Sequence, residues 1–180
     1  GQYKLEPVGD VTFDPTNART VAPEVDAEAD LVIASYNVLN FFNGDGLGGG
    51  FPTPRGADDQ AEYDRQLAKL VSAINTINAD IVGLMEIEND GYGADSAIAD
   101  LVAKVNALLG GQVYQYVVPT TPQLGSDAIT VGFIYKPATV TLEGSAVSTS
   151  ASPFDYGNRQ PLAQTFKELA TGESLTIAVN

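Results

Sequence analysis

The sequence predicts an α/β fold built on a mixed sheet with two main helices. Two runs, 31–39 and 81–88, are almost continuously apolar and rich in branched residues, as is typical of strands buried on both faces. After each run comes a segment whose apolar residues recur at helical spacing. The remainder of the chain has the pattern of several successive strands. Alternating strands and helices followed by a strand meander predict this fold class.

The elements follow in order from residue 31. Residues 1–30 contain Pro7, Pro15 and Pro23 and many acidic side chains, so we interpret them as a linker or edge extension. Residues 31–180 then form one domain. A long segment rich in Gly and Pro, 41–55, follows the first strand and is expected to be a loop.

Two helices are predicted from caps and apolar spacing. Asp59 begins the first helix, and Glu62 three residues later completes a capping arrangement. The second helix begins near Asp95 or Ser96 and ends at Gly110. Their apolar faces consist of Tyr63, Leu67, Leu70, Val71, Ile74 and Ile77 in the first, and Ile98, Leu101, Val102, Val105, Leu108 and Leu109 in the second. Further strands are expected at 114–118, 129–135, 140–147, 162–166 and 175–179.

Composition limits the chemistry. The chain has no Cys and no His, which excludes disulfides, thiolate chemistry, zinc sites that need Cys, and the commonest general base. The net charge of −14 repels nucleic acid and anionic membranes unless cations or a local basic patch intervene. Such acidity suits a secreted or salt-exposed protein, although solubility alone also accounts for it. No apolar run is long enough to cross a bilayer, so we expect no membrane partner.

Two polar residues lie toward the carboxyl ends of the predicted buried strands. Asn37 belongs to the first strand and Glu86 to the second. Ligands of α/β sheets gather at that edge, and amide and carboxylate oxygens suit Mg²⁺ or Ca²⁺. The alternative is that both side chains simply face solvent. Glu88 is expected to share a strand face with Glu86, whereas a polar loop is the preferred interpretation for Glu88 and Asp90.

Two further candidates precede later strands. Arg159 comes directly before the strand at 162–166, where a guanidinium could clamp a phosphate through two hydrogen bonds; an ordinary surface Arg is the alternative. Asp127 comes just before the strand at 129–135. The Gly-rich loop lacks the spacing of a P-loop, which excludes that mode of nucleotide binding.

Four segments in this order resemble the endonuclease/exonuclease/phosphatase superfamily, and within it the secreted bacterial nucleases. They are ASYNVLNFF at 34–42, DIVGLMEIEN at 80–89, SDAITVGFIYKP at 126–137 and NRQP at 158–161. The resemblance spans residues 31–180. It implies a four-layer α/β/β/α sandwich of two sheets packed face to face.

The resemblance also implies an activity and a site. Members hydrolyse phosphodiester or phosphomonoester bonds with a divalent metal, Mg²⁺ first, with Ca²⁺ or Mn²⁺ as alternatives. Glu86 would be the principal metal ligand, Asn37 would orient the metal or the phosphate, and Arg159 would contact phosphate. Asp127 falls in a motif of the secreted subgroup and is a candidate for substrate binding. The full-length protein would be an extracellular hydrolase of nucleic acid, with DNA favoured over RNA.

The sequence departs from the family at its end. In relatives, the strand matching 175–180 runs into a catalytic His, and later acidic, Asn and His residues complete the site; this chain stops at Asn180. We therefore expect half of the sandwich, with one mixed sheet and two helices, that is inactive alone. The bare sheet face would be covered by a second copy or by the remaining half.

Two other functions stay open on the sequence. One keeps the fold and makes the protein a phosphatase that acts on a small phosphate ester. The other is a calcium-binding adhesion or structural module, which the acidic composition allows but which has no need of Arg159.

Overall fold

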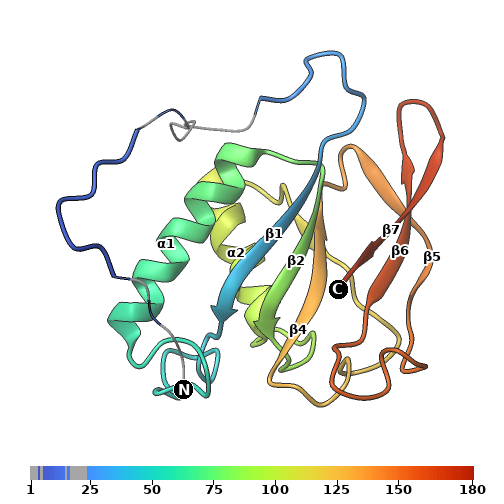
Figure 1. The fold of residues 1–180 in the computed structure, drawn as a ribbon. Coiled ribbons are helices and arrows are strands. Elements are labelled where there is room, and N and C mark those ends of the chain that lie inside the picture. Colours follow the sequence, from blue (N-terminus) through green and yellow to red (C-terminus); the bar gives the residue numbers. More distant parts are fainter. Residues whose placement is uncertain (1–3, 5, 15, 17–23) are drawn as a thin grey trace.

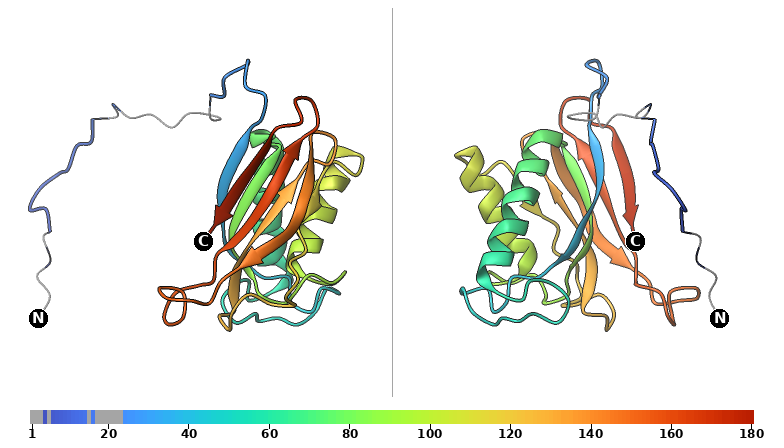
Figure 2. Two further views of the ribbon diagram at one scale, coloured as in Figure 1. Left: turned by 90° about the vertical axis from the view of Figure 1, so that its right-hand side faces the viewer. Right: turned by 60° about the vertical axis from the view of Figure 1, so that its left-hand side comes forward.

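The computed structural model describes residues 4, 6–14, 16 and 24–180, arranged in three layers (Figures 1 and 2). Helices α1 (Gln60–Ile77) and α2 (Ala97–Leu109) lie together on one face of a four-stranded sheet. A three-stranded sheet packs against the opposite face. The predicted α/β class with a mixed sheet and two main helices is confirmed.

The first sheet has the order β1-β2-β4-β3. Its strands are β1 (Ile33–Phe41), β2 (Ile81–Glu88), β4 (Ile129–Tyr135) and the short β3 (Gln115–Tyr116). β1 runs parallel to β2, whereas β4 is antiparallel to both β2 and β3. β2 therefore lies in the interior of the sheet, with a partner on each side.

The second sheet is an antiparallel meander of β5 (Val140–Ser148), β6 (Leu162–Glu168) and β7 (Ser174–Val179). The prediction that residues 31–180 contain one sheet is therefore wrong, because they form two. Both edges of β4 are already paired, with β2 and β3, so the chain cannot continue the first sheet at that strand. After Pro137 it turns and begins a new layer instead.

Two apolar cores hold the three layers together. The core between helices and first sheet contains Ile74, Leu84 and Leu101, all fully buried. The core between the sheets contains Phe133 and Phe166, whose rings meet edge to face with centroids 5.7 Å apart. From Ile81 to Met85 the side chains of β2 point alternately into the core between the sheets and the core under the helices, which explains why this part of the strand is apolar throughout.

The helix ends agree with the predicted caps. Asp59 Oδ1 accepts a hydrogen bond from the Glu62 amide at 2.8 Å, and Glu62 Oε2 accepts one from the Asp58 amide at 3.0 Å. Ser96 caps α2, and Gly110 ends it with a left-handed φ of 72°. The predicted apolar faces are buried or half-buried, except that Leu108 is exposed.

The linker assigned to residues 1–30 stays a prediction. Residues 1–3, 5, 15 and 17–23 lie outside the described residues, and the others up to residue 30 form no helix or strand. Neither described helix combines the length and the apolar character that crossing a bilayer requires.

The exposed sheet face is smaller than predicted. The second sheet covers β2 and β4, where Ile81, Val131 and Phe133 are buried in the core between the sheets. β1 at the edge of the first sheet is less well covered, because Ile33, Ser35 and Asn37 on this face are exposed, Ile33 to 46%. No described helix lies on the outer face of the second sheet (Figure 2).

One buried hydrogen bond joins the residue before β3 to the segment that leads into β2. The Tyr114 hydroxyl donates to the Ala79 carbonyl at 2.7 Å, and both residues are fully buried. Tyr114→Phe leaves that carbonyl unpaired, so we expect a loss of about 1–2 kcal/mol in unfolding free energy. Urea unfolding measures it. The matched control is Tyr156→Phe, at a side chain that is 91% exposed; equal stability of the two variants would contradict the assignment.

Candidate functional site

The ladders on both sides of β2 are interrupted at the same level. Between β1 and β2, Asn37 pairs with Met85 and the next pair is Phe41 with Ile87. Between β2 and β4, Met85 pairs with Val131 and Ile87 with the adjacent Thr130, so that Glu86 is the extra residue of a bulge. The two predicted metal ligands therefore come from neighbouring strands at one level of the sheet.

The bulge at Glu86 changes the direction of its side chain. Met85 packs against the core between the sheets, whereas Ile87 belongs to the core under the helices. In a regular strand these two residues would share a face. Glu86 between them has a φ of +63°, a left-handed conformation that is strained for a residue with a Cβ. It is half-exposed, and no hydrogen bond or ion pair among the described residues reaches its carboxylate.

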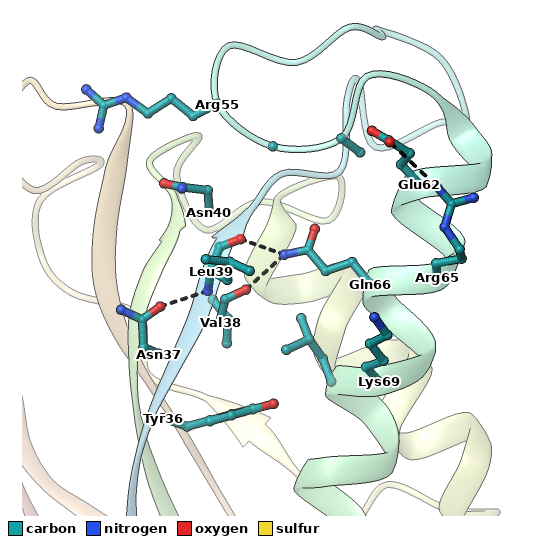
Figure 3. Close-up of a pocket in the computed structure, with 13 residues that line it drawn as sticks. Tyr36, Asn37, Val38, Leu39, Asn40, Arg55, Glu62, Arg65, Gln66 and Lys69 are labelled. Atoms are coloured by element: carbon teal, nitrogen blue, oxygen red, sulfur yellow. Dashed lines mark hydrogen bonds and ion pairs between the residues drawn. The ribbon is translucent and has the colours of Figure 1, made fainter. Parts of the chain in front are cut away.

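The β1 irregularity is held from two sides (Figure 3). Leu39 and Asn40 both have left-handed φ values, 56° and 48°. Gln66 of α1 donates to the carbonyls of Val38 at 2.9 Å and Leu39 at 2.7 Å. On the side of the strand away from α1, Asn37 Oδ1 accepts a hydrogen bond from the Leu39 amide at 2.8 Å. That amide oxygen keeps a second lone pair for a ligand.

The donor set fits a hard divalent cation. A partner-free carboxylate and an amide oxygen are the groups that Mg²⁺ takes from a protein, with water completing the octahedron. Within the part of the chain that the structure describes, no three acidic side chains gather into a metal-binding group. The metal roles of Glu86 and Asn37 stay predictions, with this pair as their structural basis.

The other polar residues at the end of β2 fasten loops. Glu88 accepts from the Asn43 amide at 3.2 Å, and burial, with a smaller effect of the Asp90 charge, raises the pKa of Glu88 to about 7. Asp90 accepts from the Ala97 amide at 2.9 Å, and burial raises the pKa of its carboxyl as well. These contacts favour the loop interpretation for both. Glu86 and Glu88 were expected to share a face because side chains alternate along a regular strand. The bulge at Glu86 breaks this alternation.

Asn89, buried between these acids, anchors the loop that carries Asp127. Its side-chain nitrogen donates to the carbonyls of Leu124 at 3.1 Å and Asp127 at 3.0 Å, and its backbone amide donates to Ala128 at 2.9 Å. The position of Asp127 is thus fixed from the end of β2.

Asp127 joins two arginines. Arg159 Nε donates to Asp127 Oδ2 at 2.9 Å, so the structure brings together two residues that the sequence singled out separately. The other carboxylate oxygen lies 2.8 Å from Arg55 Nη2. Desolvation raises the pKa of Asp127. The hydrogen bond from Arg159 and the charge of Arg55 lower it by more, so the pKa of Asp127 lies below its usual value.

Sequence reasoning missed Arg55. Its one signal was that it is the single basic residue of the Gly-rich loop at 41–55. It lines two cavities: one of about 650 Å³ between β1 and α1, with Asn37 and Asn40, and one of about 710 Å³ with Asp127 and Arg159. Arg55 therefore lies between the predicted metal ligand Asn37 and the predicted phosphate contact Arg159. Glu86 lines neither cavity.

No family model and no curated protein matches the sequence, but solved structures match the fold. An endonuclease/exonuclease/phosphatase family protein from Bacteroides thetaiotaomicron matches with a TM-score of 0.51 at 16% identity, over 82% of this chain and 48% of that one. A mannosyl-6-phosphatase from Bacteroides thetaiotaomicron VPI-5482 matches with a TM-score of 0.50 at 14% identity, over 82% and 50%. The human Nocturnin catalytic domain with bound sulfate gives 0.48 at 16%, over 82% and 48%.

The chain has the fold of endonuclease/exonuclease/phosphatase proteins. It spans about half the length of these solved structures. The fold that the sequence resemblance implied is thus confirmed, whereas membership of the superfamily and of its secreted bacterial subgroup stays a prediction. The described residues supply three layers of the expected four.

The Asn89 anchor can be tested with an isosteric change. Asn89→Asp replaces a donor that faces carbonyl oxygens by an acceptor, so we expect a loss of about 2–3 kcal/mol in unfolding free energy. The same change at exposed Asn158, whose side chain donates to the Pro153 carbonyl, is the control. Urea unfolding compares the two, and equal losses would show that Asn89 is no special anchor.

Proposed function

We propose that this chain supplies part of the active site of a metal-dependent phosphodiester hydrolase, an extracellular nuclease in its full-length form. The observation that carries the proposal is the strained bulge at Glu86, which keeps a partner-free carboxylate beside the Asn37 strand. Backbone strain of this kind is retained where a side chain must be aimed at a function.

Glu86 and Asn37 are the residues that would hold the metal, with Mg²⁺ preferred and Ca²⁺ or Mn²⁺ as alternatives. Such an ion supplies charge neutralisation at phosphate oxygens. Arg159 donates guanidinium N–H groups to the same phosphate and stabilises the charge that develops on it. Asp127 holds Arg159 in place through its 2.9 Å hydrogen bond, which makes it an orienting residue for substrate binding.

A local basic patch supports an anionic substrate. With a net charge of −14, the chain needs such a patch to bind a polyanion. The cavity beside Asn37 is lined by Arg55, Arg65 and Lys69, with Glu62 as the acidic residue among its lining. These side chains offset the acidity of the protein where a nucleic acid would approach, and DNA is the favoured substrate on the sequence motifs.

A phosphatase acting on a small phosphate ester is the second candidate. The cavities of about 650 and 710 Å³ have the size of small-molecule sites. The calcium-binding module is less well supported, because it has no need of an arginine fixed by a carboxylate. We further propose that a second copy, or additional polypeptide of the full-length protein, covers the exposed edge at β1.

Metal binding can be measured on the 180-residue chain itself. We expect Mn²⁺ or Mg²⁺ to bind, and Glu86→Gln to weaken the affinity by at least about tenfold, since a neutral amide replaces the charged ligand. Isothermal titration calorimetry measures the affinity. Glu173→Gln, the same change at an exposed residue, is the control. If both variants bind the metal like the unmodified chain, Glu86 is not a ligand.

Substrate class is separated by activity. A polypeptide that extends this chain to the length of the solved structures is expected to cleave plasmid DNA faster than p-nitrophenyl phosphate, and Glu86→Gln is expected to abolish cleavage. The 180-residue chain alone is expected to cleave neither. The reverse substrate order would favour the phosphatase. Thermal stabilisation by Ca²⁺ without cleavage of either substrate would favour the calcium module.

A further inference from the structure

Arg55 projects from a turn that is rigidly built. The Thr53 amide donates to the Ala57 carbonyl at 3.0 Å, and the Thr53 hydroxyl donates to the same oxygen at 2.9 Å. The Gly56 amide in turn donates to the Thr53 hydroxyl oxygen at 3.0 Å. Thr53 and Ala57 are buried. Arg55 is therefore held at the tip of a closed turn inside the Gly-rich loop.

This turn is seated directly on the end of β1. A Cβ placed on Gly56 would lie 2.7 Å from the Asn40 carbonyl oxygen and 2.9 Å from Phe42 Cβ. Only a glycine allows this approach. Because Asn40 is part of the irregularity that follows Asn37, the same segment of β1 positions both Asn37 and the turn of Arg55.

Arg55 and Arg159 face each other across one carboxylate. Each guanidinium uses one nitrogen on Asp127, at 2.8 and 2.9 Å. An arginine has five N–H donors, so each retains donors for a ligand. The two side chains are 45% and 42% exposed, and both line the cavity of about 710 Å³. With Asp127 and Asp155 in the lining, the charged side chains of this cavity balance, so both guanidiniums keep donors for a ligand in a neutral site within a chain that is otherwise strongly acidic.

We propose that Arg55 and Arg159 together form a two-arginine phosphate site, with Asp127 as the spacer that holds the guanidiniums close enough to contact one phosphate group. Arg55 is then a second phosphate-binding residue, and positioning it is a role of the Gly-rich loop. This inference rests on the proposed phosphoester hydrolase function and adds a residue to its substrate site. Planar guanidiniums suit the tetrahedral oxygens of phosphate because each can donate two parallel hydrogen bonds.

Inorganic phosphate is the probe, titrated into the 180-residue chain at low salt. The NMR signals of the arginine Nε–H groups report which side chains contact it. We expect those of Arg55 and Arg159 to shift together, and Arg55→Gln and Arg159→Gln each to weaken binding about five- to tenfold, as for an exposed charged hydrogen bond. Arg55→Lys, which keeps the charge but loses the planar fork, is expected to be intermediate.

The matched control is Lys167→Gln. It removes one positive charge from an exposed residue of β6 that lines neither cavity. Phosphate affinity within about twofold of the unmodified chain is expected for this variant. Equal weakening by Arg55→Gln and Lys167→Gln would mean a general charge effect and would overturn the inference.

Failure of the inference is distinguishable from failure of the proposed function. If Arg159→Gln weakens phosphate binding while Arg55→Gln does not, Arg55 is no part of the site, and the hydrolase proposal stands. If the unmodified chain binds neither phosphate nor a divalent metal, both fail. Circular dichroism melting of each variant excludes unfolding as the cause, and should Arg55→Gln fail to fold, Arg55→Lys carries the comparison.

Discussion

The strand β2 must stay apolar on both faces until it reaches the sheet edge, and the rest of the site depends on how it ends. Val82 and Leu84 face the core under the helices, so a regular strand would direct Glu86 into that core as well. An unpaired carboxylate there would cost several kcal/mol. The bulge lets Ile87 take the helix-facing position and releases Glu86 to the edge. The strain of a left-handed residue, about 1–3 kcal/mol, is the smaller cost.

The neighbouring segments follow from that ending. β1 pairs with β2 on both sides of the interruption, so it must break its own regularity between Asn37 and Phe41. This break leaves the carbonyls of Val38 and Leu39 without partners in the sheet, and the Gln66 side chain donates hydrogen bonds to both. Past the bulge, Glu88, Asn89 and Asp90 each bind the backbone of a different segment. The sheet edge is thus a junction where three loops meet, which is how residues from distant parts of the chain reach one place.

The sequence predicted what is locally encoded. Caps at Asp59 and Ser96, helical spacing and the apolar run of β2 depend on neighbouring residues, and these elements were found within a few residues. The division into two sheets depends on which strand edges are already paired, which no local pattern reveals. The bulge left one trace, a Glu at a core-facing position of the run at 81–88, whose meaning is clear only with the pairing of β4.

The site was predicted in pieces for the same reason. Asn37, Glu86, Asp127 and Arg159 were each named, but the contact between Asp127 and Arg159 spans 32 residues of sequence and arises from tertiary packing. Arg55 was missed because it belongs to a loop whose course is set by glycines and by its seat on Asn40. The motifs of a protein family identify functional residues at strand ends well. They identify loop residues only where the loop itself is part of the motif.

Net charge and local charge act at different ranges in this protein. The formal charge of −14 produces a repulsive field for any polyanion, but at physiological salt that field is screened over about 8 Å. Arg55 and Arg159 act at contact distance, where screening is weak and where both guanidiniums are already oriented by Asp127. The acidity therefore slows the association of an anionic ligand, whereas the two arginines of the proposed phosphate site slow its dissociation. An acidic surface and the proposed phosphate site are compatible in one chain because the fold places four of its nine basic residues, Arg55, Arg65, Lys69 and Arg159, at the cavities beside Asn37 and Asp127.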